Sequence, residues 1–195
     1  GYIPSSKLPA IEAASLAACD LNDRVKDGVI ENPAACRLDA AGLLCDGTET
    51  DACLTAPKVA PPRTLYGGLE DDRTPMPGYS PGAEAGPGGW RLWITGPKLE
   101  SSWLFLFMTN FYKYMVFDDP AWDYRTFDAE RDVRAGVEEV GAIVDATNAD
   151  LTAFRGRGGK LILYHGWTDA AIPAAGTIDY YERVVEHGGV EACDG

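Results

Sequence analysis

The stretch 158–173, GGKLILYHGWTDAAIP, limits the possible folds more than any other part of the chain. Two glycines lead into the short apolar run 161–164, which predicts a β-strand buried on both faces in a parallel sheet. A polar loop containing His165 and Asp169 follows, and from residue 172 the apolar side chains have helical spacing up to Gly188. This order of strand, loop and helix predicts an α/β fold.

Asp169 is a candidate catalytic acid because of its position on the loop after the predicted strand. In open α/β sheets, ligands and catalytic groups gather at the carboxyl ends of the strands. The alternative is a carboxylate that only shapes the turn, which is a common use of Asp. Spacing alone leaves both interpretations open.

The chain is strongly acidic, with a formal net charge of −13 over 195 residues. This balance argues against nucleic acid and against an anionic membrane as partners, since both require basic patches. No apolar run approaches the roughly 20 residues that a membrane-spanning helix needs. The first ten residues, GYIPSSKLPA, lack the pattern of a signal peptide, although a signal can lie upstream if the chain is a fragment.

Five cysteines are present, and four of them lie within a polar, turn-rich region without a C-x-x-C pair of the kind that binds zinc. Their order predicts two local disulfides, Cys19 with Cys36 and Cys45 with Cys53, and therefore an oxidising compartment. Each bond closes a short loop and is expected to contribute about 2 to 3 kcal/mol. Cys193 is left over, either as a free thiol or paired with something outside the chain.

A cluster of acids follows the first predicted helix, which spans residues 9–19 and begins near Pro9. Asp20, Asp23 and Asp27 would repel one another on a single helical face, so this segment is either a loop or is held by a cation. Calcium suits such a set because it takes oxygen ligands from flexible loops. The carbonyls of Val25 and Val29 would complete its shell; the alternative is a solvated acidic turn.

The middle of the chain combines a long loop-like region with an aromatic helix. Residues 37–100 are rich in Gly, Pro and Asp and show little periodicity. Residues 101–117, SSWLFLFMTNFYKYMVF, predict a buried helix, with a pocket lined by aromatic side chains as the alternative. Asp128 is the expected cap of a helix that continues over 133–144, and Asn148 or Asp150 is the expected cap of a short helix through residue 154.

One catalytic motif is rejected. Residues 78–82, GYSPG, match the G-x-S-x-G nucleophile elbow, and with Asp169 and His187 they give the serine, acid and histidine order of hydrolases. The residue after the nucleophile must donate its backbone N–H to the oxyanion, and Pro81 has none. The segment also lacks a preceding strand and a following helix. Ser80 is therefore not predicted to be a nucleophile.

Several segments in combination give the chain a family resemblance. They are the acidic segment CD..D.VKDGVI.NP..C, the run DPAWDYRTFD and the run HGW.D, together with YIPSSKLPAIEAA, CLT.P.V and GGW..WITGP. On these residues the chain resembles the tannase and feruloyl esterase family over essentially its whole length. The resemblance implies an α/β-hydrolase fold with a large inserted lid domain.

The resemblance assigns roles residue by residue. It implies that Asp169 is the triad acid that orients a general-base histidine. It also implies that Asp20, Asp23 and Asp27 bind a structural calcium ion with the carbonyls of Val25 and Val29, bracketed by the Cys19–Cys36 disulfide. Family members carry the nucleophile in a Gly-Cys-Ser-x-Gly-Gly setting and the histidine in a Gly-His-Cys setting, and this sequence contains neither. The chain is therefore expected to be an internal fragment, with a partial lid at 1–148 and part of the catalytic core at 149–195.

The predicted function is that of a secreted or periplasmic serine esterase that hydrolyses esters of aromatic acids, such as feruloyl or galloyl esters. The fragment alone is expected to be inactive because it lacks the nucleophile. The alternative is a non-catalytic, calcium-stabilised extracellular binding module, which the acidic loop and the exposed-looking Trp90 and Trp93 would suit. Arg24 stands where many family members have glycine, so a positive φ there would weaken calcium binding.

Overall fold

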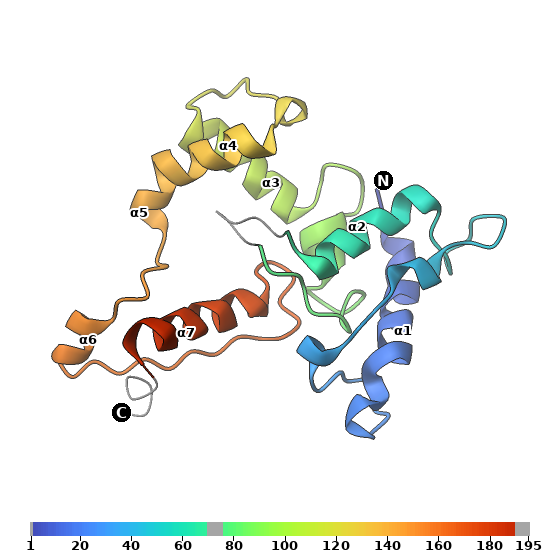
Figure 1. The fold of residues 1–195 in the computed structure, drawn as a ribbon. Helices are drawn as coiled ribbons and strands as arrows, with labels where there is room; N and C mark the ends of the chain where they lie inside the picture. Colours follow the sequence, from blue (N-terminus) through green and yellow to red (C-terminus); the bar gives the residue numbers. More distant parts are fainter. Residues whose placement is uncertain (1, 70–75, 190–195) are drawn as a thin grey trace. The chain divides into compact units, whose positions relative to one another are not determined.

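The computed structural model describes residues 2–69 and 76–189, and the regular structure of these residues is helical (Figure 1). The α-helices are α1 (Leu8–Cys19), α2 (Ala56–Gly67), α3 (Trp103–Asn110), α4 (Ala129–Gly136), α5 (Ala142–Val144), α6 (Thr152–Gly156) and α7 (Ala174–Gly188). Five 3-10 turns are η1 (Ser5–Lys7), η2 (Asp20–Asp23), η3 (Pro33–Ala35), η4 (Ala40–Leu43) and η7 (Tyr124–Thr126), and three π-helical segments are η5 (Arg91–Thr95), η6 (Phe111–Val116) and η8 (Val137–Gly141).

The chain divides into two compact units. The first comprises residues 1–102 and 162–179, and the second comprises residues 103–161 and 180–195. The predicted boundary between lid and catalytic core, at residues 148 and 149, concerns the complete fold and stays a prediction.

Helix α1 forms the centre of the first unit. Pro9 lies in its first turn, which confirms the predicted start, because proline there loses no intrahelical hydrogen bond. Its buried residues are Leu8, Ile11, Ser15 and Cys19, whose spacing places them on one face. This face contributes to a core that also contains Ile3, Ala40, Leu43, Leu54, Val59, Trp90 and Ala170. Ala170 connects the loop of Asp169 to this core.

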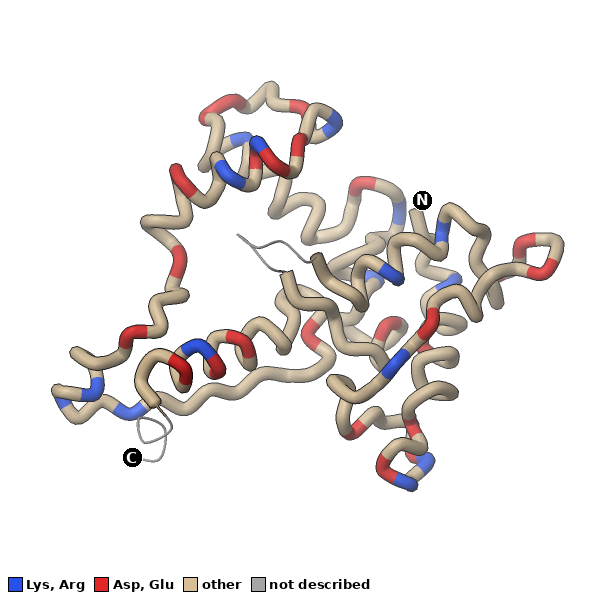
Figure 2. Tube along the Cα trace, in the orientation of Figure 1, with Lys and Arg blue, Asp and Glu red and all other residues tan. Residues whose placement is uncertain are grey.

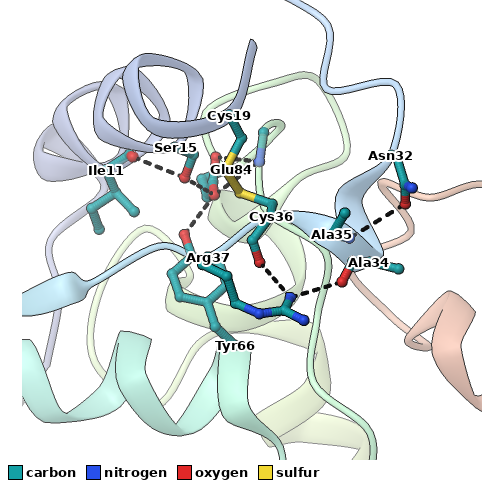
Figure 3. Close-up of a disulfide and its surroundings, with 11 residues drawn as sticks. Ile11, Ser15, Cys19, Asn32, Ala34, Ala35, Cys36, Arg37, Tyr66 and Glu84 are labelled. Atoms are coloured by element: carbon teal, nitrogen blue, oxygen red, sulfur yellow. Dashed lines mark hydrogen bonds between the residues drawn. A yellow bond between two sulfur atoms is a disulfide. The ribbon is translucent and has the colours of Figure 1, made fainter. Parts of the chain in front are cut away.

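Two buried charged side chains connect segments of the first unit that are distant in sequence. The ammonium group of Lys7 donates to the carbonyl oxygens of Thr50 and Cys53 and contacts Glu49 at 2.9 Å. Glu84 is fully buried, and its carboxylate accepts hydrogen bonds from Ser15 at 2.8 Å, from the Tyr66 hydroxyl and from the backbone N–H of Gly82 (Figure 3). Glu84 thereby connects α1, α2 and the loop that leads to Trp90.

The predicted loop-like character of residues 37–100 is wrong for α2, although residues 76–90 are irregular as expected. Helix α2 forms despite Pro61 and Pro62 in its interior. Val59 and Pro62 are buried, so packing outweighs the loss of backbone hydrogen bonds that these prolines cause. Trp90, expected to be exposed, is only 2% exposed and packs with its ring centroid 5.2 Å from that of Tyr66.

The second unit is organised around an aromatic cluster. Tyr112 is buried, and its ring centroid lies 5.2 to 5.9 Å from those of Phe111, Phe117, Trp122 and Phe127. The helix predicted over residues 101–117 is present as α3 and η6, but its predicted burial is wrong for α3, none of whose residues is buried. The aromatic cluster covers only one part of this segment, because the described residues of the unit supply too little apolar surface to surround a helix that is hydrophobic on all sides.

Helix α4 begins as the sequence predicts. The Asp128 side chain accepts a hydrogen bond from the backbone N–H of Arg131, which confirms the predicted cap. Asp132 is fully buried within the first turn and is paired with the guanidinium group of Arg131. The cap predicted at Asn148 or Asp150 is wrong, because the N-cap residue of α6 is Leu151, whose side chain makes no capping bond; the Asp150 side chain accepts from the N–H of Thr152 in the turn before the helix.

The strand predicted at residues 161–164 is not formed among the described residues, although α7 follows it as expected. Its side chains are exposed, with Ile162 at 87% and Tyr164 at 93%. A strand requires neighbouring strands to bond its backbone groups. The described part of the chain contains no such neighbour, so the segment runs without pairing.

Candidate functional site

Asp169 lies in the loop that precedes α7, and the backbone of that loop fixes one of its carboxylate oxygens. Oδ1 accepts hydrogen bonds from the backbone N–H groups of Ala171, at 2.8 Å, and Ile172, at 3.0 Å. Asp side chains commonly form this kind of turn with the residues that follow them. The second oxygen, Oδ2, lies 3.5 Å from Nε2 of His165, and the Asp169 side chain is 40% exposed. The carboxylate is thus held in orientation while part of it stays accessible.

The surroundings of Asp169 favour its charged form. Partial burial raises the pKa of its carboxyl group, but the hydrogen bonds from Ile172 and Ala171, together with nearby His165, hold this pKa below its usual range. Asp169 is therefore ionised at neutral pH. An oriented and ionised carboxylate is what a general-base histidine needs from a triad acid.

The rejected motif at residues 78–82 lies against this loop. The hydroxyl of Tyr79 donates to the carbonyl oxygen of Ala171 at 3.3 Å. Burial and then the charge of Asp169 raise the pKa of the Tyr79 phenol, so the hydroxyl keeps its proton. A side chain on Gly78 would overlap the carbonyl group of Tyr66, which explains the glycine without a catalytic role. The motif thus contributes to packing around Asp169.

A cavity of about 620 Å³ in the first unit also reaches this region. Its lining includes the basic side chains of Arg37 and Arg63 and the aromatic rings of Tyr66, Tyr79 and Trp167. Aromatic walls with a few polar groups are typical of sites for small molecules. Because stretches that are distant in sequence contribute to this lining, sequence patterns did not reveal it.

The acidic loop predicted to bind calcium follows α1, and Figure 2 shows acidic and basic positions close together in it. Asp20 is buried and accepts from the backbone N–H groups of Asp27, at 3.3 Å, and Gly28, at 3.2 Å. Asp23 accepts from the N–H of Val25 at 2.8 Å, and Asp27 from that of Val29 at 3.0 Å.

Carboxylate oxygens have the right chemistry for calcium. Nevertheless, residues 2–69 and 76–189 contain no group of three His, Cys, Asp or Glu side chains placed to hold a metal ion.

Arg24 adopts the left-handed conformation, with φ of 75°. The positive φ considered for this position from the sequence is therefore present. A non-glycine residue in this region is strained by roughly 1 to 2 kcal/mol.

Both predicted disulfides are present. Cys19 is bonded to Cys36, with Cα atoms 5.5 Å apart, and Cys45 to Cys53, with Cα atoms 4.9 Å apart. The first lies in a small core cluster with Ile30 and joins the two ends of the acidic segment. Cys193 lies outside the described residues.

Thr177 is a residue close to Asp169 that the sequence analysis did not single out. Its hydroxyl lies 2.7 Å from Nδ1 of His165. The two residues are 12 positions apart, and only the turn between the loop and α7 brings them together. The other histidine, His187, lies 3.5 Å from Asp150. His187, the histidine that the rejected Ser80 motif would need as its base, is thus in contact with Asp150.

Two solved structures on which the chain superposes are esterases. The chain superposes on the crystal structure of an esterase from Aspergillus oryzae with a TM-score of 0.83 and 26% identity, covering 97% of this chain and 36% of that one. It superposes on feruloyl esterase B from the same organism with a TM-score of 0.82 and 25% identity, covering 96% and 36%. The chain is therefore similar in fold to a part of two esterase structures.

The chain belongs to the tannase and feruloyl esterase family, whose model matches residues 1–194. It is 43% identical to an uncharacterised esterase of Xanthomonas campestris pv. campestris over 196 residues, which cover 94% of this chain and 34% of that relative. It is 30% identical to feruloyl esterase B of Aspergillus niger, covering 94% and 34%. The chain thus spans about a third of the length of these relatives.

Proposed function

We propose that this chain is the part of a serine carboxylic ester hydrolase that supplies a lid and the triad acid, Asp169. The observation that carries the proposal is the state of this carboxylate: one oxygen is fixed by two backbone N–H groups, the side chain is 40% exposed, and the pKa of the carboxyl group is lowered. The family match over residues 1–194 supports the same assignment.

In this proposal the complete protein has an α/β-hydrolase core with an inserted lid, residues 1–148 belonging to the lid and 149–195 to the core. The exposed apolar run 161–164 becomes a central strand between strands that the remainder of the protein supplies. Its exposure in this chain supports that role, because Ile162 and Tyr164 are 87% and 93% exposed, whereas strands of parallel sheets are normally buried on both faces.

The chemistry assigned to Asp169 is orientation and charge compensation. A serine outside this chain attacks the ester carbonyl, and a histidine outside this chain takes the serine proton and passes it to the leaving alcohol. Asp169 holds that histidine in the productive tautomer and stabilises its positive charge. Two backbone N–H groups stabilise the oxyanion. This chain by itself, lacking the nucleophile, is proposed to be inactive.

The proposed substrates are esters of aromatic acids, with feruloyl and galloyl esters as the leading candidates. The support is the name of the matched family and of relatives such as feruloyl esterase B of Aspergillus niger. Small esters, rather than nucleic acid or membrane, also suit a chain with a net charge of −13. No helix within residues 2–69 and 76–189 has both the length and the hydrophobicity for a membrane crossing.

We further propose a structural calcium ion in the acidic loop, with Asp20, Asp23 and Asp27 and the carbonyls of Val25 and Val29 as ligands. The support is the concentration of oxygen donors within a segment closed by the Cys19–Cys36 disulfide. The backbone N–H groups bond to Oδ1 of Asp23 and of Asp27, which leaves Oδ2 of each carboxylate as a ligand for the ion. The two disulfides also support a secreted or periplasmic location, since such bonds persist in oxidising compartments.

The test uses the complete protein encoded by the gene that contains this chain. Hydrolysis of methyl ferulate and methyl gallate is measured before and after treatment with a serine-reactive fluorophosphonate. The proposal predicts ester hydrolysis that the reagent abolishes. A complete protein without ester hydrolysis, or with hydrolysis that resists the reagent, contradicts it. Replacing Ser80 by Ala serves as a control and should leave the rate unchanged, because that serine is not the proposed nucleophile.

A further inference from the structure

The imidazole of His165 lies between two side chains of the first unit. Its Nδ1 is 2.7 Å from the hydroxyl oxygen of Thr177, in the first turn of α7, and its Nε2 is 3.5 Å from Oδ2 of Asp169. The His165 side chain is only 19% exposed, so the ring is largely removed from water. The arrangement therefore forms a chain of polar groups from a helix to the carboxylate.

The chemistry of the ring favours one tautomer. In a neutral imidazole one nitrogen donates and the other accepts. If Thr177 donates its hydroxyl proton to Nδ1, then Nε2 carries the ring proton and directs it at the negative charge of Asp169. The opposite tautomer would place a lone pair of Nε2 against the carboxylate, which is electrostatically unfavourable. The charge of Asp169 thus favours the Nε2–H tautomer of His165, and the Thr177 hydroxyl, which can donate to Nδ1, supports it.

The two oxygens of Asp169 are then restrained from different sides. The backbone N–H groups of Ala171 and Ile172 hold Oδ1, and the ring of His165 faces Oδ2. Rotation of the carboxylate would break contacts at both oxygens. Its remaining accessible lone pairs are available to another hydrogen-bond donor.

We propose that His165, held by Thr177, is a positioning residue that fixes the orientation of the Asp169 carboxylate for the general-base histidine. The inference rests on the proposed function, because it assumes that Asp169 is the triad acid. It adds Thr177 and His165 to the residues on which the reaction depends, without giving either a contact with the substrate.

The chain contains its own comparison. Nε2 of His187 lies 3.5 Å from Oδ1 of Asp150, the same separation as in the pair His165 and Asp169, but the His187 side chain is 52% exposed. Among the contacts that the structure gives His187, no threonine holds the second ring nitrogen. His187 should therefore report how a histidine beside an aspartate behaves without a threonine hydroxyl at its second ring nitrogen.

The first experiment measures the ring nitrogens of both histidines by ¹⁵N NMR in this chain at a pH where they are neutral, with His187→Gln used for assignment. The expected result is an Nε2–H tautomer for His165 in the wild type and in Thr177→Ser, which keeps the hydroxyl. In Thr177→Val the preference should be reduced, while the His187 signals stay unchanged. An unchanged His165 tautomer in Thr177→Val overturns the proposal. If that variant does not fold, Thr177→Ala replaces it.

The second experiment measures methyl ferulate hydrolysis by the complete protein. Thr177→Val should lower kcat about five- to tenfold with KM within twofold, and Thr177→Ser should restore kcat. Thr109→Val is the matched control, because the hydroxyl of Thr109 bonds within its own helix, to the carbonyl of Phe105 at 2.7 Å. An unchanged kcat in Thr177→Val overturns the inference.

Asp169→Asn separates this inference from the proposed function. If that variant loses activity while Thr177→Val keeps it, the positioning role is wrong and the triad acid stands. If Asp169→Asn keeps full activity, the triad assignment is wrong, and with it the role of His165.

Discussion

Glu84 offers the sharpest test of what holds the first unit together. Its carboxylate has no solvent exposure and accepts from Ser15, Tyr66 and the N–H of Gly82. Replacing Glu84 by Ala removes the acceptor of all three donors. Ser15 retains its second acceptor, the Ile11 carbonyl at 3.2 Å, so two donors in partly buried positions, the Tyr66 hydroxyl and the Gly82 N–H, lose this partner. At about 1 to 3 kcal/mol for each such group, the free energy of unfolding should fall by about 2 to 6 kcal/mol.

The assay is urea denaturation of the chain, monitored by tryptophan fluorescence. Trp90 is buried, and its backbone N–H donates to the backbone carbonyl of Glu84, so it lies close to the changed residue. Glu31→Ala, at an exposed position, is the matched control and should change the free energy of unfolding by less than about 0.5 kcal/mol. Combining Glu84→Ala with Tyr66→Phe should cost less than the sum of the single changes, since the phenol then needs no acceptor. A loss below about 1 kcal/mol in Glu84→Ala would refute this account of the network.

Four further outcomes are expected. Arg24→Gly should raise the free energy of unfolding by about 0.5 to 1 kcal/mol, because glycine adopts the left-handed backbone conformation without strain. Gly28→Ala should lower the free energy of unfolding by about 1 kcal/mol, because Gly28 has φ of 81° and the added carbon would meet open space, so that only the backbone strain acts. Urea denaturation measures both, and an unchanged stability in Gly28→Ala contradicts the backbone assignment. The pKa of Asp132 is lowered, chiefly by the hydrogen bond from Arg131. The charged carboxylate therefore stabilises the fold above the unfolded-state pKa of 3.8, and this stabilisation is lost as the pH falls through the lower folded-state pKa. Asp132→Asn should therefore flatten the dependence of melting temperature on pH below the unfolded-state value of 3.8, and an unchanged slope would exclude this source of acid sensitivity. Finally, chelation of calcium should lower the melting temperature of the wild type but not of Asp23→Ala, and a melting temperature insensitive to chelator would remove the proposed ion.

Local sequence signals predicted the elements whose formation depends on near neighbours. Pro9 marked the start of α1, and Asp128 marked that of α4 through a hydrogen bond only three residues away. The two disulfides were predictable because each closes a loop of fewer than twenty residues, with sequence separations of 17 and 8. Asp169 was singled out by its place between an apolar run and a helix.

Contacts between distant residues were not predictable in the same way. Helix α2 contradicts the local preference of Pro61 and Pro62, and it forms because Val59 and Pro62 pack into the core. The hydrogen bond between Ser15 and Glu84 joins residues 69 positions apart, so no sequence periodicity predicts it. Trp90 lies among glycines that suggest an exposed loop, yet its ring packs against Tyr66.

The strand predicted at 161–164 depends on strands that the described residues do not include. Apolar sequence predicts how such a segment behaves inside a sheet, whereas the observed exposure of Ile162 reflects the absence of pairing in residues 2–69 and 76–189. The burial predicted for α3 is wrong for a related reason. Burial requires other apolar residues to cover the helix, and among the described residues none of the α3 side chains is buried.

Asp169→Asn in the complete protein tests the central claim most directly. The kcat for methyl ferulate is compared with that of the wild type and of Asp150→Asn, which changes the aspartate beside the other histidine. If Asp169 is the triad acid, its replacement should lower kcat by about 10⁴-fold, as expected when the catalytic histidine loses the group that orients it, and the control should stay within twofold. Equal kcat values in the wild type and Asp169→Asn would contradict the assignment.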